Sequence, residues 1–404
     1  MIILLLGGCT TFVPRTHLPP PIVNDESGET LRLVTIPLPV VAASPNEGVT
    51  VGGLSAFLFH NRRDELDSLL APQINENSNF GTTISLYGVF FHSDSTTIET
   101  NLSRSAAVNE DYEIRFQRNP FPRGENETNL FLFRFVDGSS RFFGFGSGSE
   151  KGGETNYAND EWGVNASYGW KIGRHYQLQV GERVRHVRIR EGAVESLPFI
   201  RTRWNGESVP GIDRFTAHAQ RVSLVYSTLD APQMATFGGY TRISVEGSSR
   251  LLGSSADYRH YEIDLRGYVP IGSNRFITAF RGLYNQTLGD AVPFLERSIL
   301  GGETTLRGYG RNRFIDSSFI LFNLEERVRL ARWEIFGVTA DWEIAPFVDC
   351  GGVMERLTTL KKSDLVLTPG IGVRAVVRPN VVGRLDIGFS DEGAAVFVGL
   401  GYPF

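Results

Sequence analysis

The sequence has few of the features that mark the common protein classes. Only two of its 404 residues are cysteines, Cys9 and Cys350, which are too few for a disulfide framework. No stretch reaches the roughly 18 consecutive apolar residues that a membrane-spanning helix requires. The formal net charge of −5 argues against nucleic acid as a main partner. A pair of ordinary globular domains or one large β-barrel remain compatible with this length.

Recognisable catalytic and metal-binding motifs are missing as well. The chain contains no His-Glu-x-x-His, paired Cys-x-x-Cys or Gly-x-Ser-x-Gly segment. Its seven histidines are scattered and do not pair at ligand spacing. We therefore expect neither an enzyme nor a metal or other cofactor site.

The first residues, Met1 to Cys9 (MIILLLGGC), form a short apolar run. Small residues directly before a cysteine resemble a lipoprotein cleavage site, after which Cys9 would be acylated. The run is shorter than an ordinary signal core and lacks a basic start. Two interpretations stay open for residues 1–9: a lipoprotein-type leader with acylation at Cys9, or an ordinary cleaved or truncated signal. Residues 10–47 are rich in proline without a sustained period, which predicts an extended periplasmic lead-in.

From Gly48 to the last residue, strand-like segments with alternating polarity follow one another. We expect about sixteen strands, at 48–60, 80–92, 94–104, 111–119, 129–138, 155–171, 174–190, 215–229, 238–252, 257–270, 274–288, 316–330, 333–350, 365–378, 381–390 and 394–404. Glycine (44 residues) and aromatic residues (11%) also favour strands over helices. An even count suits a transmembrane antiparallel barrel, so residues 48–404 are predicted to form an all-β outer-membrane barrel.

The connections between these strands support the barrel. Every other connection is long, and the turns between them are mostly tight. The long connections are 61–79, 139–154, 191–214, 289–315 and 351–364. Long external loops alternating with short periplasmic turns are typical of outer-membrane barrels.

The strand faces indicate a polar lumen inside an apolar band. In 333–350, Trp342 and Val348 share one face, while Glu343 and Asp349 share the other. In 316–330, Glu325 lies on the polar face. A charged face opposite an apolar one predicts a wet lumen surrounded by lipid. The basic alternating run 183–190 fits a lumen-facing stripe or a solvated face, with anionic lipopolysaccharide as an alternative ligand.

The chain ends in an aromatic residue, with a second one nearby. Gly399, Tyr402 and Phe404 are similar to the C-terminal signal that barrel-insertion machinery recognises. The alternative is a last strand that merely ends in an interfacial aromatic residue. We expect the insertion signal, because the terminal pattern coincides with a barrel-like order of loops.

A glycine-rich segment between two strands carries the candidate site. It contains Leu306, Arg307, Gly308 and Tyr309. The face assignment points Glu325 and Asp349, on the two strands that follow, into the lumen. An external loop folded back into the barrel would place the Arg307 guanidinium against both carboxylates, a geometrically specific pairing.

This segment resembles the Val-Arg-Gly-Phe/Tyr motif of the BamA/TamA superfamily (bacterial surface antigen type). The resemblance implies that Glu325 on the twelfth strand and Asp349 on the thirteenth hold Arg307. The segments 141–146 and 39–45 resemble further family segments, and the likeness extends over about 39–404. Family members carry periplasmic POTRA domains, but only about 46 residues precede the first predicted strand. We therefore expect a short member without them.

The resemblance implies a role in protein insertion or translocation at the outer membrane. The seam between the first and last predicted strands, 48–60 and 394–404, would open towards lipid or a client strand. The alternative is a non-catalytic pore, or a membrane anchor for a periplasmic partner supplied in trans. Expected partners are outer-membrane lipids, the barrel-insertion machinery, and client proteins or that periplasmic partner, with no nucleic acid.

Overall fold

A computed structural model describes most of the chain. It describes residues 9–14, 30–61, 66–93, 95–118, 126–231, 234–272, 275–335, 338–377 and 381–404, with no side-chain placement at 9–14, 30, 335, 338, 339 and 381. The expected leader, apart from the Cys9 backbone, lies outside these residues, as do positions 15–29 of the expected lead-in. No helix within the described residues is long and apolar enough to cross a membrane.

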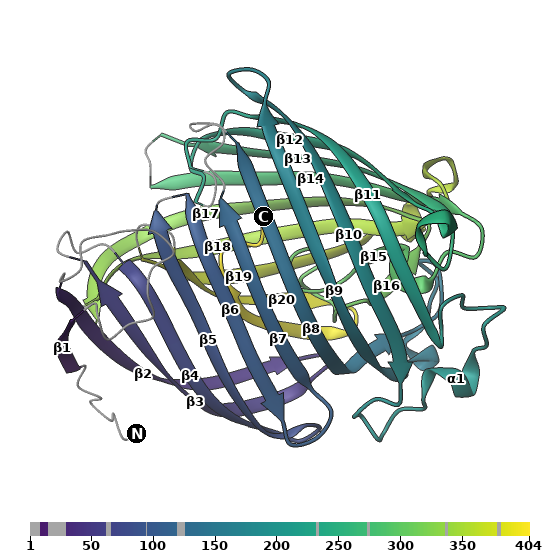
Figure 1. Cartoon of the computed structure of the whole chain (residues 1–404), viewed down its shortest axis with the longest axis horizontal. Helices are drawn as coiled ribbons and strands as arrows, with labels where there is room; N and C mark the ends of the chain where they lie inside the picture. The colour runs from purple at the N-terminus through teal and green to yellow at the C-terminus, as the bar shows by residue number, and fades with distance from the viewer. Residues whose placement is uncertain are drawn as a thin grey trace.

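Eighteen antiparallel strands of the described chain form a nearly closed barrel (Figure 1). Each strand pairs with its neighbour along the wall, and β14 pairs with β17 because β15 and β16 form a separate small hairpin. The wall strands are β2 (Thr30–Ser44), β3 (Gly48–His60), β4 (Leu66–Asn77), β5 (Gly81–Ser93), β6 (Thr96–Ser105), β7 (Glu110–Arg118), β8 (Glu127–Phe142), β9 (Thr155–Lys171), β10 (Tyr176–Arg190), β11 (Arg214–Ser227), β12 (Gly238–Ser248), β13 (Tyr258–Pro270), β14 (Phe276–Gly289), β17 (Ser318–Ile335), β18 (Val338–Met354), β19 (Val366–Val377), β20 (Val381–Ser390) and β21 (Gly393–Leu400). The hairpin strands are β15 (Ser298–Leu300) and β16 (Phe314–Asp316).

The all-β barrel is confirmed, but the number of strands differs from the predicted sixteen. Two strands were missed: β2, within the expected lead-in, and β4, within the expected loop 61–79. The barrel wall therefore begins at Thr30 rather than at Gly48. Pro37 and Pro39 in β2 and Pro72 in β4 broke the strand pattern, since proline cannot donate to a ladder.

All the long connections lie at one end of the barrel, which we call the loop end. They are residues 143–154, 191–213, 290–317 and 355–365, and α1 (Ile200–Arg203) marks this end in Figure 1. The opposite end, which we call the tail end, holds shorter connections, the longest of them 228–237, and the last residues of the chain. Apolar side chains from the loops and strand ends pack together at the loop end, among them Phe142, Tyr157, Ile200 and Phe294.

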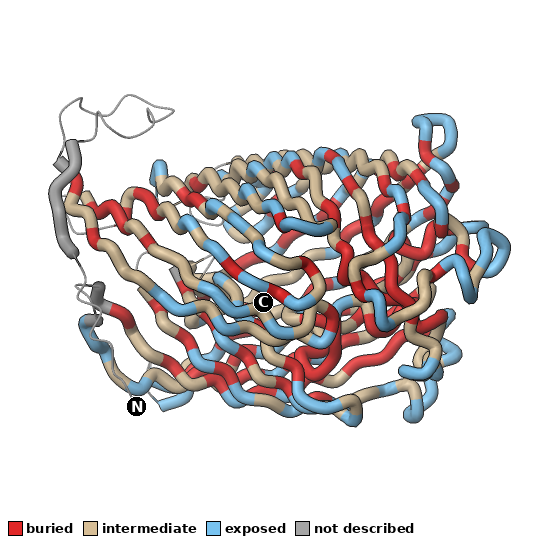
Figure 2. The backbone as a smooth tube through the Cα atoms, turned by 90° about the horizontal axis from the view of Figure 1, so that it is seen from below, coloured by how far each residue is buried: buried red, intermediate tan, exposed pale blue. Residues whose placement is uncertain are grey.

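Outward-facing side chains along the wall are apolar and exposed, while most alternate positions are buried. Phe322 and Leu324 of β17 are each 53% exposed, whereas Glu325 is fully buried. Figure 2 shows exposed and buried residues alternating along many strands. Tyr168, Trp170 and Tyr226 gather near the tail-end borders of neighbouring strands. An apolar band with aromatic residues at its border is the surface that a bilayer requires.

Strands β2 and β21 lie side by side, yet the described chain contains no ladder between them. The seam therefore joins β2 to β21, and the expected seam between 48–60 and the last strand is wrong. A short strand, β1 (Cys9–Pro14), pairs with the start of β2 from Thr30 to Thr35. The remaining part of β2 contains both Pro37 and Pro39, which share one strand edge.

The last strand ends earlier than expected. β21 stops at Leu400, and Gly401 turns the chain with a φ of 80°. Residues 401–404, which we call the tail, then line the lumen. Phe404 is 8% exposed and packs with Tyr268 and Ile277. The C-terminus accordingly lies within the outline of the barrel in Figures 1 and 2.

Candidate functional site

The connection from β14 to β17, residues 290–317, folds into the barrel, and we call it the Arg307 loop. Its apolar side chains make a small core against the wall. Leu300 and Leu306 are fully buried there, and Tyr309 is 3% exposed. Gly301 and Gly302 adopt φ values of 110° and 105°, which other residues rarely reach. The loop is therefore a packed structure with a defined path.

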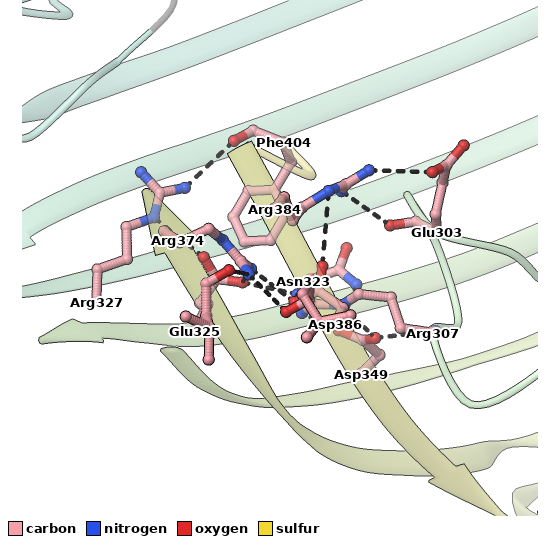
Figure 3. A network of polar contacts seen from close by, with 12 residues as sticks. Glu303, Arg307, Asn323, Glu325, Arg327, Asp349, Arg374, Arg384, Asp386 and Phe404 are labelled. Carbon is pink, nitrogen blue, oxygen red and sulfur yellow. Dashed lines mark hydrogen bonds and ion pairs between the residues drawn. The ribbon is translucent and has the colours of Figure 1, made fainter. Parts of the chain in front are cut away.

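Arg307 meets two carboxylates from successive wall strands (Figure 3). Its Nη1 donates to Oε2 of Glu325 at 2.7 Å, and its Nη2 donates to Oδ1 of Asp349 at 2.8 Å. Its Nε and its backbone N–H both donate to Oδ2 of Asp349, at 2.9 and 3.1 Å. The structure thus brings Arg307, Glu325 and Asp349 together in a forked, charge-assisted arrangement.

An aromatic ring and neighbouring backbone pack closely around Arg307. Its guanidinium carbon lies 3.4 Å from the centre of the Phe347 ring. Gly308 and Gly388 allow the two backbones to meet, since a Cβ on Gly388 would lie 2.1 Å from the Arg307 carbonyl oxygen. Burial alone would lower the pKa of Arg307, but the acidic side chains, led by Asp349, raise it above its ordinary value. Arg307 is therefore a permanent cation held in one position.

The cluster extends over two further strands that sequence reasoning left out. Arg374 of β19 lies 3.2 Å from Glu325 and 2.7 Å from Asp386 of β20, both measured from its Nη2. Arg327 lies 3.1 Å from Glu325. These buried groups alternate with outward apolar residues along their strands. The face assignment used for 316–330 would have found Arg374 and Asp386 had it been applied to 365–378 and 381–390.

The Arg307 loop has a second charged anchor, on β10 and β13. Glu296 accepts hydrogen bonds from Arg183 Nη2 at 2.7 Å and from the Tyr258 hydroxyl at 2.6 Å. Arg185 Nη1 lies 3.2 Å from the same carboxylate. Burial alone would raise the pKa of Glu296, but the nearby cations Arg183 and Arg185 outweigh burial and lower this pKa to about 2. Sequence reasoning noted the basic run of β10 but not its acidic partner in the loop.

The same loop also contacts the turns on both sides of the seam. On the β20–β21 turn, Asp391 accepts a hydrogen bond from the Tyr309 hydroxyl at 2.5 Å, and Glu392 pairs with Arg313 at 2.7 Å. On the β2–β3 turn, Asn46 donates to the Arg311 carbonyl oxygen at 3.1 Å. The loop therefore bridges the two turns that flank the strands without a ladder.

The segment 141–146 lies against this bridge. Arg141 Nη2 donates to the Asn46 carbonyl oxygen at 2.7 Å. The backbone N–H of Gly146 donates to the Ile315 carbonyl oxygen of the loop, and Phe143 lies 4.3 Å beneath the Arg313 guanidinium. The aromatic-glycine segment and the Arg307 loop are thus packed as one unit at the loop end.

The residues of the expected C-terminal signal are distributed differently. Gly399 remains in β21, while Tyr402 and Phe404 leave the wall and point into the lumen. The Tyr402 hydroxyl donates to Glu343 at 2.8 Å, and the Arg327 guanidinium stacks 3.7 Å above its ring. The side chain of Cys9, the candidate acylation site, lies outside the described part of the structure.

Comparison with known proteins places this geometry in a family. The Omp85 superfamily domain matches residues 54–379. No significantly similar curated protein was found. Among solved structures, the chain is similar to BamA from Haemophilus ducreyi lacking POTRA domains 1–3, with a TM-score of 0.52 and 13% identity over 91% of this chain and 74% of that one.

A second similar structure is CdiB from Acinetobacter baumannii, with a TM-score of 0.50 and 11% identity over 98% of this chain and 66% of that one. At these identities the structural matches show the fold. The family match covers most of the chain and agrees with the barrel wall and its lipid-facing surface. The chain belongs to the Omp85 superfamily, as an integral β-barrel of the bacterial outer membrane.

Proposed function

We propose that this barrel assists protein insertion or translocation at the outer membrane, using the seam between β2 and β21. One observation carries the proposal: these adjacent strands have no ladder in the described chain, whereas each of the other wall strands pairs on both sides. An unpaired strand edge can pair with another chain by strand addition. Membership in the Omp85 superfamily supports this role.

The Arg307 loop would control the seam rather than take part in chemistry. Its anchors on Glu325 and Asp349 fix it to β17 and β18 of the wall. Its contacts with Asn46 and Asp391 hold the two flanking turns together from the loop end. A client strand could then enter only after these outer contacts rearranged, while the buried anchors kept the loop attached.

The test is a disulfide lock across the seam, in a Cys350→Ser background. Candidate positions are Ala43 in β2 and Ala394 in β21, both at the loop end of their strands. Client insertion into proteoliposomes should stop when the lock forms and recover after reduction. The matched control joins Phe389 to Ala394, which already face each other in a ladder, and should keep activity. Full activity with the seam locked would overturn the proposal.

A pore or a membrane anchor is the second candidate function. The tail-end half of the lumen contains a cavity of about 800 Å³, and Thr304 of the Arg307 loop forms part of its lining. Planar-bilayer conductance that is low in the native protein and high after Arg307→Ala would favour a gated pore. A periplasmic protein that co-purifies stoichiometrically with the intact chain would favour the anchor.

A further inference from the structure

The charged residues that line the tail-end cavity are mostly cations. Its lining includes five arginines and two glutamates, Glu99 and Glu127. The arginines are Arg115, Arg242, Arg266, Arg281 and Arg327. A second cavity, on the wall from β7 to β12, shares Arg115 and Arg242 with the first. The two cavities therefore adjoin at these two guanidinium groups.

The carboxylates that pair with Arg242, Arg266 and Arg281 are less exposed than these arginines. Asp264, which binds Arg266 and Arg281, has a fully buried side chain, whereas the Arg266 side chain is 26% exposed. Glu262 is 14% exposed and its partner Arg242 is 28% exposed. The carboxylates thus hold the guanidinium groups in place from the wall side. Guanidinium N–H donors therefore form part of the surface presented to the cavity.

Arg115 differs from the others because it has no acidic partner. Within the described chain no carboxylate lies at ion-pair distance from it, although Glu99 lies opposite it in the β6–β7 ladder and lines the same cavity. Its guanidinium lies 4.3 Å above the Phe131 ring. Phe131, Phe133 and Phe135 stack in turn, with ring centres 4.9 and 5.8 Å apart. This aromatic column positions a cation without neutralising it.

Arg242 also retains an unused donor. Its Nη2 donates to Glu262 at 2.8 Å, but its buried Nε has no hydrogen-bond partner among the described residues. A buried donor without a partner is unfavourable, while the partly exposed remainder of the guanidinium group faces the cavity. Arg115 and Arg242 together place two guanidinium groups at one part of the lining. Phosphate and carboxylate groups match such planar, forked donors.

We propose that the tail-end half of the lumen is a binding site for a phosphate-bearing anion, held by Arg115 and Arg242. Two sources could supply this chemistry. A free polyanion could enter through the tail-end mouth of the barrel. A phospholipid headgroup could enter beside the last strand, because Leu400 and the tail line the same cavity and lie next to the seam.

The test measures pyrophosphate binding to the full-length barrel by isothermal titration calorimetry in zwitterionic detergent at low salt. The native protein should bind with one saturable site. Arg115→Gln and Arg242→Gln should each weaken binding by about tenfold or more, since each removes a charge-assisted interaction. Arg104→Gln is the matched control, because Arg104 is 73% exposed and lies outside both cavities. Heat-modifiable gel mobility would verify that each variant is folded.

Mass spectrometry of the detergent-purified proteins separates the two sources. If a lipid headgroup is the occupant, anionic phospholipid should remain bound to the native protein and to Arg104→Gln but not to Arg115→Gln. If a free anion is the occupant, no variant should retain lipid while pyrophosphate binding still depends on Arg115. Absence of saturable pyrophosphate binding to lipid-free native protein, or equal binding by Arg115→Gln, would overturn the proposal.

Discussion

The Arg307 loop is held at two places, and the two anchors use opposite charges. At one anchor, a loop cation, Arg307, sits among carboxylates of β17, β18 and β20. At the other, a loop anion, Glu296, sits among Arg183, Arg185 and a tyrosine hydroxyl. In the reversed orientation, Arg307 would face arginines and Glu296 would face carboxylates, so like charges would meet. The arrangement therefore fixes the direction of the loop as well as its position.

The anchors differ in how completely their partners depend on the loop. Glu325 and Asp349 are fully buried, and Arg307 supplies four of the hydrogen bonds that satisfy them. Arg183 is 20% exposed and also pairs with Glu246. Removing Arg307 leaves buried charges behind, whereas removing Glu296 leaves arginines that keep other partners. The first loss should therefore be the larger one.

Arg307→Ala should have the largest effect. It leaves the Asp349 carboxylate without a cation, and breaking a buried pair in this way commonly costs about 3–5 kcal/mol. Urea unfolding of the barrel in lipid vesicles measures the loss of stability. Arg307→Lys, which keeps the charge but not the fork, should lose less. Equal free energies of unfolding for Arg307→Ala and the native protein would show that this anchor does not stabilise the barrel.

Glu296→Gln should come next. The amide keeps the shape of the side chain but not the charge facing Arg183 and Arg185, so we expect a loss of about 2 kcal/mol. The same unfolding measurement applies, with limited proteolysis reporting release of the loop. A loss as large as that of Arg307→Ala would contradict the ranking of the two anchors.

Acid should weaken the Glu296 anchor. Its pKa of about 2 in the folded protein is below its ordinary value of 4.5. The stabilisation is therefore fully present above about pH 4.5 and is lost as the pH falls towards 2. Proteolysis of the loop by an acid-active protease should increase over this window. In Glu296→Gln the same window should show a smaller change, and an identical change in both proteins would assign the effect to another group.

Tyr309→Phe should have the smallest effect on stability. Burial and the bond to Asp391 raise the pKa of the Tyr309 hydroxyl, so it remains a donor at neutral pH. Its loss should cost about 1 kcal/mol. The rate of disulfide formation between cysteines at Ala43 and Ala394 should nevertheless change, because the bond holds the turn beside the seam. Arg332→Gln, an exposed pair with Asp341, should alter neither quantity.

The sequence predicted the barrel well where its two faces differ. β13, β17 and β18 alternate cleanly between apolar and charged residues, so both their existence and their inward faces could be derived. The early strands do not alternate in this way, because Val34, Leu58 and Leu69 form an apolar cluster inside the barrel. With apolar residues on both faces and prolines in two strands, β2 and β4 gave no readable period.

Part of the site could be predicted for the same reason. Arg307, Glu325 and Asp349 belong to a recognisable motif and to strands with clear faces. The Glu296 anchor could not be derived, because it lies in a loop whose path depends on packing rather than on period. The inward turn of the tail was also hidden: Gly401 permits it, but only the pocket around Phe404 explains why it occurs.

The buried tail has a practical consequence for handling this protein. A purification tag fused to Phe404 would have to leave the lumen past Tyr402. Such a fusion would empty the pocket beside Tyr268 and disturb the stacking of Arg327 on Tyr402. Tags and fluorescent labels belong instead in the connection 355–365, which is exposed over most of its length at the loop end.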